Sequence, residues 1–247
     1  MTADGLLQAV RGQVGAGRTL PLGGPADGCW ITERAVARVL REAERTVPGV
    51  ALDRVRVRLA DPDAHDWGAV RTANPAAPPS AMPAGPLRIE ADFAARPDRP
   101  LPRTADLLRA VLAALAADRL GLVVTAIDLR AVGLLGPLDA DRPMADPDEA
   151  GLETGPDAAA GPVGDAAGAD GPADAVVAAA LKVGGVRGAA ARWTAGGVRA
   201  YVTVDGGFRA LDVAVAVRTA VTVAAAGERA AADGPAPATA VVVTGAG

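Results

Sequence analysis

Apolar and polar residues alternate in two stretches of the first half of the chain, and this pattern predicts two strands. In the first stretch the polar positions are Arg54, Arg56 and Arg58, and the second stretch, 87–93, alternates in the same way. A period of two is typical of a strand with one buried face. Apolar residues at helical spacing predict helices on either side. The expected order is a helix over 32–47, strands over 52–59 and 87–93, a helix over 101–120 and a strand over 122–132.

The second half of the chain shows the same order of elements at shorter length. In both halves the first helix runs into a glycine turn, VPGV at 47–50 and VGGV at 183–186. Self-similarity of this kind indicates duplication of one supersecondary unit. The fold class we predict is therefore α/β, with two tandem α-β-β-α-β units, each a small sheet with two helices on one face. The second copy is expected as a helix over 173–183, strands over 187–193 and 198–204, a helix over 210–226 and a strand over 239–244.

Composition divides the chain into four parts. Residues 1–27 carry a short helical pattern and a turn, and 28–135 form the first unit. The Pro-rich stretch 60–86 interrupts this unit, and we interpret it as a surface excursion. Residues 136–172 are almost entirely Ala, Gly, Pro and Asp, which bury too little apolar area to offset the entropy of ordering them. We predict a disordered linker there, followed by a second, degenerate unit over 173–247.

The overall composition restricts the function classes. Half of the 247 residues are apolar but only 2% are aromatic, so the core must consist mainly of Ala, Val and Leu. A net charge of -4 disfavours nucleic acid and direct binding to anionic membranes. The single cysteine excludes an intrachain disulfide, and neither a secretory signal nor an uncharged apolar run of ~18–20 residues is evident. We expect a cytoplasmic protein, peripheral to the membrane only through partners.

Two motifs suggest ligand sites, and a simpler interpretation is favoured for each. The C-terminal VVVTGAG at 241–247 is similar to the strand and glycine turn of a dinucleotide fold, but that mechanism needs a following helix, which this sequence does not provide. His65 lies among Asp61, Asp63 and Asp66, which could bind a metal. Because this cluster falls in the Pro-rich stretch, we interpret it as a solvated turn.

The inventory of nucleophiles is nearly incompatible with a catalytic triad. The chain has one each of Ser, Cys, His and Tyr, at Ser80, Cys29, His65 and Tyr201. A triad would require Ser80 and His65 on one loop without a rigid frame. Cys29 is expected to be a small buried apolar residue. We assign no catalytic, cofactor-binding or metal-binding residue and expect no cofactor, although paired carboxylates stay open as an alternative.

Several short motifs resemble the bacterial alkaline-shock, or envelope-stress-response, family. They are residues 28–33 (GCWITE), the helix ending in VPGV at 47–50, the strand at 87–93 and the helix at 104–120 that continues through Gly121 into VVTAIDL. In that family a glycine and a short strand lead into a helix that ends on a "GV" turn. The resemblance covers about 28–134 and, more weakly, 173–244. The duplication, the Pro-rich insertion, the acidic linker and the absence of a glutamine-rich second helix depart from the family pattern.

This resemblance implies a non-enzymatic, cytosolic protein that assembles with related alkaline-shock-like proteins and with a membrane-anchored partner. Tandem proteins of this type are also grouped with a nucleopolyhedrovirus fibrous-body (P-ten) family, a grouping that no feature here supports mechanistically. Two other hypotheses stay open. One is an enzyme that uses carboxylates in a cleft between the two units, and the other is a K-homology-like RNA-binding protein, which would need a Gly-x-x-Gly loop and a basic face.

Overall fold

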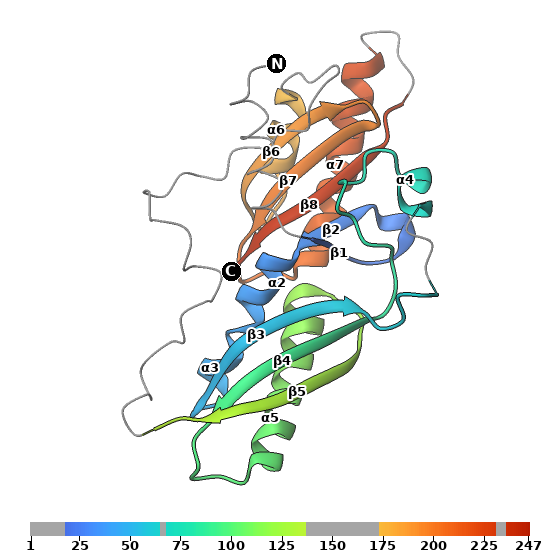
Figure 1. Cartoon of the computed structure of the whole chain (residues 1–247). Helices are drawn as coiled ribbons and strands as arrows, with labels where there is room; N and C mark the ends of the chain where they lie inside the picture. The colour runs from blue at the N-terminus through green and yellow to red at the C-terminus, as the bar shows by residue number, and fades with distance from the viewer. Residues whose placement is uncertain (1–17, 65–67, 137–172, 231–235) are drawn as a thin grey trace, which may run out of the picture.

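A computed structural model describes residues 18–64, 68–136, 173–230 and 236–247 (Figure 1). Helices and strands mix within it, and the strands form two sheets, so the predicted α/β class is confirmed. The helix expected before residue 17 and the linker expected over 136–172 lie outside the described residues, apart from residue 136 itself.

The smaller sheet has three strands in the order β3-β4-β5. These strands are β3 (Val50–Leu59), β4 (Leu87–Ala95) and β5 (Val124–Leu134). The central strand β4 is antiparallel to β3 and parallel to β5. The alternation seen in the sequence sets the two faces of this sheet, because apolar residues at every second position point to one side.

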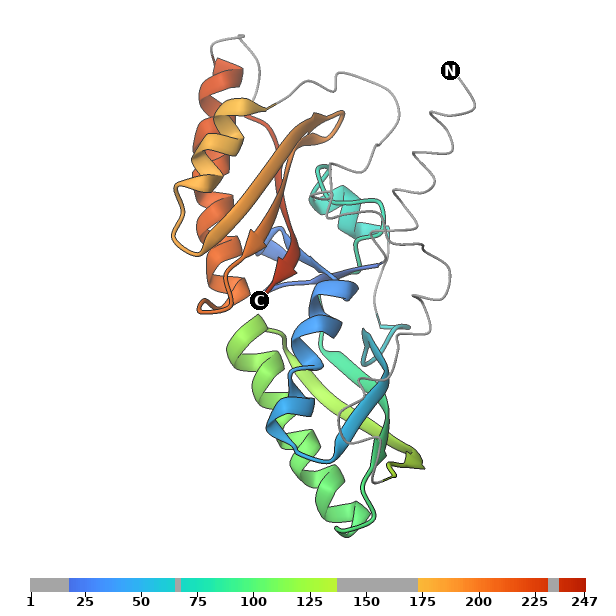
Figure 2. The same ribbon diagram turned by 90° about the vertical axis from the view of Figure 1, so that its left-hand side faces the viewer.

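Helices cover one face of the three-stranded sheet, and Figure 2 shows the other face free of them. The helices are α2 (Glu33–Leu40), α3 (Ala43–Thr46) and α5 (Leu101–Ala114), which continues as the π-helical turn η2 (Leu115–Leu120). The Thr32 side chain accepts a hydrogen bond from the Ala35 amide at 3.3 Å and so caps the N-terminus of α2. The single helix predicted over 32–47 is interrupted in the structure by a turn at residues 41–42.

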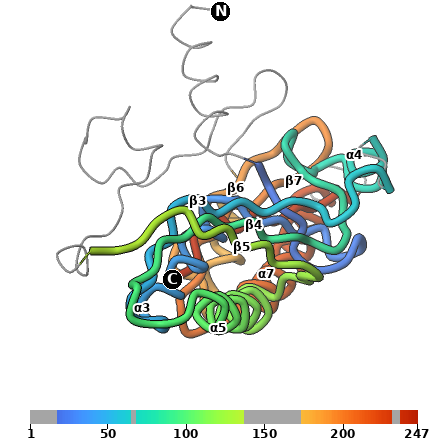
Figure 3. The backbone as a smooth tube through the Cα atoms, turned by 60° about the horizontal axis from the view of Figure 1, so that its bottom comes forward, coloured from blue at the N-terminus to red at the C-terminus, as the bar shows by residue number. Residues whose placement is uncertain are grey.

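The larger sheet has five strands in the order β1-β2-β8-β7-β6. Three come from the C-terminal half: β6 (Val186–Thr194), β7 (Gly197–Val204) and β8 (Thr239–Ala246). Helices α6 (Asp174–Leu181) and α7 (Ala210–Ala230) pack on one face. In Figure 3, α5 and α7 lie on the same side of the strands.

Strand pairing follows one scheme in both halves. In each half the second strand is central, antiparallel to the first strand and parallel to the last. The turn after the first helix has a positive φ glycine in both, +81° at Gly49 and +88° at Gly185. Only glycine adopts such a φ at little cost, so both turns require glycine at this position for the same reason. Their origin by duplication stays a prediction.

The two remaining strands connect the halves. Strands β1 (Thr19–Pro21) and β2 (Cys29–Thr32) precede the three-stranded sheet in sequence, but β2 pairs in parallel with β8. Trp30 lies opposite Val242 and Ile31 opposite Val243. The composition-based boundary at residue 28 therefore does not coincide with a sheet boundary. Strand β8 is an interior strand, with β2 on one side and β7 on the other.

The Pro-rich stretch covers part of the second face of the five-stranded sheet. After the exposed helix α4 (Ala69–Ala73), Ala76 and Ala77 are buried together with Trp30. Arg199, only 4% exposed, donates from Nε to the Ala76 carbonyl at 2.8 Å and from Nη2 to the Ala77 carbonyl at 2.7 Å. The prediction of a surface excursion is wrong for this part, because small side chains let the backbone approach the sheet and Arg199 satisfies its carbonyls.

Among the described helices, α7 is long and apolar enough to cross a membrane by length and composition, with a mean hydropathy of 1.5 over its most apolar window. Its buried side chains, however, belong to the core under the five-stranded sheet, including Val213, Val217 and Val221. A core helix passes the same test, so the length and composition of α7 are weak evidence for a membrane span.

Candidate functional site

The candidate site is the uncovered outer face of the three-stranded sheet, which we call the open face. It surrounds a shallow hollow of 310 Å³. Each strand contributes charged side chains that alternate with core residues such as Val57, Ile89 and Leu129. The charged residues of the open face are Arg54, Arg56 and Arg58 on β3, Arg88, Glu90 and Asp92 on β4, and Asp128 and Arg130 on β5.

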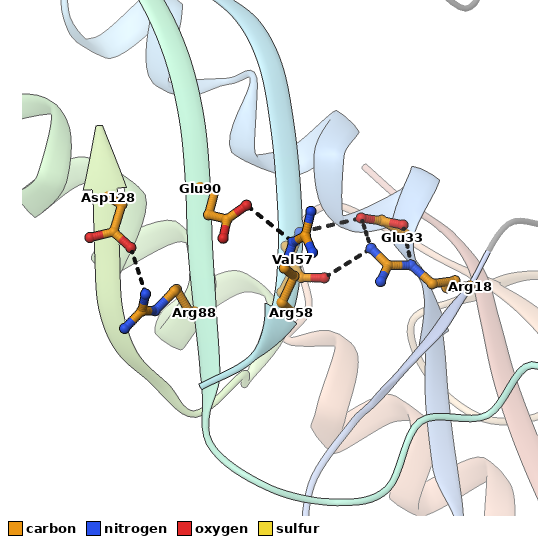
Figure 4. Close-up of polar contacts among 7 residues, drawn as sticks. All are labelled: Arg18, Glu33, Val57, Arg58, Arg88, Glu90 and Asp128. Carbon is orange, nitrogen blue, oxygen red and sulfur yellow. Dashed lines mark hydrogen bonds and ion pairs between the residues drawn. The ribbon is translucent and has the colours of Figure 1, made fainter. Parts of the chain in front are cut away.

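Two ion pairs cross the strands on the open face (Figure 4). Arg58 Nε lies 3.1 Å from Glu90 Oε2, and Arg88 Nη1 lies 3.4 Å from Asp128 Oδ2. All four side chains are more than 40% exposed. Because exposed ion pairs contribute only ~0–1 kcal/mol, they do not hold the sheet together. They order the side chains while leaving them accessible to a binding partner.

The remaining charges on the open face have no ion pair within the described part of the chain. These are Arg54, Arg56, Asp92 and Arg130. Asp92 and Arg130 are direct neighbours in the β4–β5 register. With five arginines and three carboxylates, the open face is positive although the whole chain carries a net charge of -4.

The outer edge of β3 is closed by side chains (Figure 4). Arg18 Nη2 lies 2.9 Å from Glu33 Oε1 and donates to the Val57 carbonyl at 3.4 Å, and Glu33 Oε1 accepts from the Val57 amide at 3.3 Å. Further along, the Leu52 amide donates to Glu44 Oε1 at 2.7 Å. These bonds occupy backbone groups that an added strand would need, so they protect this edge from pairing.

The residues considered for catalysis do not assemble in the described structure. Ser80 is exposed, and its hydroxyl lies 3.4 Å from that of Thr19. Tyr201 accepts from Arg192 Nη2 at 3.0 Å on the outer face of the five-stranded sheet. Asp61 Oδ1 accepts from the Asp63 amide at 3.2 Å, as in a local turn, whereas His65 and Asp66 lie outside the described residues. Within the described ranges no group of three or more His, Cys, Asp or Glu is placed to bind a metal.

Cys29 occupies the buried position that the sequence predicts. It is 3% exposed on β2, and its thiol donates to the Asp27 carbonyl at 3.1 Å. Burial raises the pKa of the Cys29 thiol to about 12, against a smaller opposing influence of Arg218. A thiol with such a pKa holds almost no thiolate at neutral pH, so it is a poor nucleophile.

We therefore expect Cys29 to be unreactive in the folded protein. At pH 8 a thiol reagent such as dithionitrobenzoate should modify it at least ~100-fold more slowly than in urea, because both the thiolate and access are lacking. The matched control is the same chain unfolded, which contains the same single cysteine. Equal rates in the two states would show that β2 does not stay paired with β8.

The open face carries a sequence signal that differs from the two motifs that suggested ligand sites. The alternation of arginines and carboxylates on neighbouring strands is visible in the sequence, and it predicts the strands correctly. It also describes an ordinary solvated sheet face. The difference between the two sheets distinguishes this face. Residues 74–82 pack on the outer face of the five-stranded sheet, whereas within the described residues no such segment packs on the outer face of the three-stranded sheet.

No family model and no curated protein sequence matches the chain. Solved structures similar to it include the copper form of a MamM CTD variant, at 16% identity and a TM-score of 0.25, covering 40% of this chain and 95% of that chain. The zinc form of another MamM CTD variant has 16% identity and a TM-score of 0.27, covering 44% of this chain and 93% of that chain. At these TM-scores the likeness carries no argument about what this chain does.

Proposed function

We propose that this chain is a non-enzymatic interaction protein that binds a protein partner through the open face. The observation that carries the proposal is the contrast between the two sheets. Residues 74–82 cover part of the second face of the five-stranded sheet, whereas within the described residues no helix lies over the second face of the three-stranded sheet, which carries ordered charges. Rows of arginine with interspersed carboxylates suit a partner with the complementary pattern, because such patterns give specificity.

The chemistry of the open face suits binding better than catalysis. Each of its carboxylates has an arginine close by. Glu90 and Asp128 form the ion pairs with Arg58 and Arg88, and Asp92 lies opposite Arg130 in the β4–β5 register. General acid–base catalysis needs a group held within reach of a bound substrate, whereas these carboxylates lie on an exposed face and two of them are engaged in ion pairs. The hollow also lies on this outer face rather than between the two sheets, where an enzyme working in a cleft between the units would need it.

The finer part of the proposal concerns the partner and the cellular setting. The resemblance of 28–33 and 47–50 to the alkaline-shock family supports a role in the envelope stress response. We propose that the partners are related alkaline-shock-like proteins and a membrane-anchored protein, and that the chain reaches the inner face of the membrane only through them. The net charge of -4 agrees with recruitment by a partner rather than by anionic lipid.

Reversing charges on the open face should abolish partner binding. The test variant combines Arg54→Glu and Arg56→Glu, and a control variant combines Arg34→Glu and Arg38→Glu on the exposed side of α2. Both change the net charge equally. Affinity capture from detergent-solubilised source cells, followed by mass spectrometry, should recover the same proteins with wild type and control, and at least ~10-fold less with the test variant.

Two outcomes would contradict this proposal. Equal recovery with the test variant would show that the open face is not the binding surface. If the proteins lost with the test variant include neither a membrane-anchored protein nor a related small protein, the envelope-stress part is wrong although the surface is right. Circular dichroism of all three proteins must first show the same fold.

A further inference from the structure

Strand β5 is an unpaired edge of the three-stranded sheet. It lies last in the order β3-β4-β5, and every side chain along Val124–Leu134 is half-buried or exposed. Within the described part of the chain, no side chain bonds to the backbone of its outer edge, in contrast to the closed edge of β3. An open edge strand is a template for pairing with another strand.

The core side of β5 is incompletely covered. Its inward residues Ile127 and Leu129 are only half-buried, although Ile89 and Ala91, their neighbours in register on β4, are buried. Beside β5, helix α5 leaves Leu107 45% exposed. A strand added at this edge would cover the flank of these core residues.

We propose that β5 pairs with β5 of a second copy of this chain, antiparallel and centred on Leu129, to join two three-stranded sheets into one. In this register residue i lies opposite residue 258 minus i of the other copy. Asp128 then faces Arg130 of the second copy, and its own Arg130 faces the second copy's Asp128. All four side chains lie on the open face, so both contacts join opposite charges, which stabilises cross-strand pairs.

The geometry of β5 fits this arrangement. Register shifts fall near its ends, between Leu87 and Arg88 and between Phe93 and Ala94 on β4, so the regular segment is 126–131. That segment contains the proposed centre and both charged residues. The two-fold axis is perpendicular to the sheet, so both copies of α5 lie on the same side, and their exposed Leu101 and Leu107 supply apolar surface there.

Two other sheet edges, β3 and β6, fit a second copy less well. Self-pairing of β3 about Arg56 would place Arg54 opposite Arg58 of the other copy, and like charges opposite each other destabilise a pair. Edge strand β6 carries Arg187 and Arg192 and no acidic residue, so self-pairing there brings cations together without carboxylates. Of these three edges, β5 has both charge signs in a self-complementary order.

The test uses the full chain and two single charge reversals. In Asp128→Arg, the new arginine opposes Arg130 of the second copy, and in Arg130→Asp the new carboxylate opposes the second copy's Asp128. Analytical ultracentrifugation across a concentration series should show a wild-type dimer. Each variant alone should dimerise at least about tenfold more weakly, because two attractive cross-strand pairs become repulsive.

Mixing the two variants in equal amounts should restore dimers. In the mixed dimer the two new residues face each other, and the unchanged Arg130 of one copy faces the unchanged Asp128 of the other. Arg54→Glu, on the open face but away from this edge, is the control and should leave wild-type dimerisation unchanged. Thermal melts separate loss of dimerisation from loss of fold, which matters because Asp128 also pairs with Arg88.

Three results would overturn the pairing: a wild-type chain that stays monomeric throughout, single variants that dimerise like wild type, or a mixture that stays monomeric. Growth past the dimer would mean that β5 meets a different edge, and would also overturn it. The inference goes beyond the proposed function and does not depend on it. A monomeric wild type that still captures its partners refutes only the β5 pairing.

Discussion

A fragment consisting of residues 173–247 is expected not to fold stably by itself. In the whole chain β8 is an interior strand, and Val241 and Val243 are fully buried between β2 and β7. The fragment lacks β2, so one edge of β8 becomes open, and the outer face loses Trp30 and residues 74–82. Exposing a fully buried valine or leucine costs ~1.5–3 kcal/mol, and a domain has only ~5–15 kcal/mol in total.

Circular dichroism and a urea titration of the fragment provide the measurement, and 1–136 is the matched partner. The fragment should show little cooperative unfolding, and adding 1–136 should restore it, because that piece supplies β1, β2 and 74–82. A sharp, two-state transition of 173–247 at the midpoint of the full chain would contradict the expectation. It would mean that the pairing of β2 with β8 contributes little stability.

The individual elements could be predicted because their signals are local. The alternation of Arg54, Arg56 and Arg58 with valines gave β3 nearly to the residue, and the glycine turns at Gly49 and Gly185 gave the helix ends. Period and turn chemistry depend on neighbours in sequence. Both are therefore visible without any knowledge of the tertiary structure.

The assembly of the two sheets had no such signal. Pairing of β2 with β8 joins the two ends of the chain, and nothing in the five residues around Trp30 indicates which strand lies beside it. Arg199 shows that the sequence also does not indicate which side chains on the outer face of a sheet are buried. It alternates with apolar residues on β7, which indicates an exposed charge, yet it is buried beneath Ala76 and Ala77. The sequence therefore does not indicate which sheet residues 74–82 cover. The open face of the three-stranded sheet is recognised only from the structure.

The second large effect is expected from Leu40→Asp. Leu40 is the last residue of α2 and is fully buried in the main core. Helix α2 packs against η2, which belongs to the three-stranded sheet's helical layer, and against β8 of the five-stranded sheet. It therefore belongs to the contact between the two sheets. An unpaired carboxylate in this position costs several kcal/mol, comparable with the total stability of a domain. The free energy of unfolding should fall by at least ~4 kcal/mol.

Arg38→Asp provides the control, because this substitution introduces the same residue, aspartate, on the exposed side of the same helix. Arg41 is less suitable, since it is half-buried and donates to the Asp53 carbonyl at 3.3 Å. Losing a cation near the end of a helix costs about 0.3–1 kcal/mol, so the control should shift the melting temperature by only a few degrees. Thermal unfolding followed by circular dichroism measures both variants. Because α2 contacts both sheets, Leu40→Asp should lower one common transition, and a loss confined to half of the signal would show that the two sheets unfold independently.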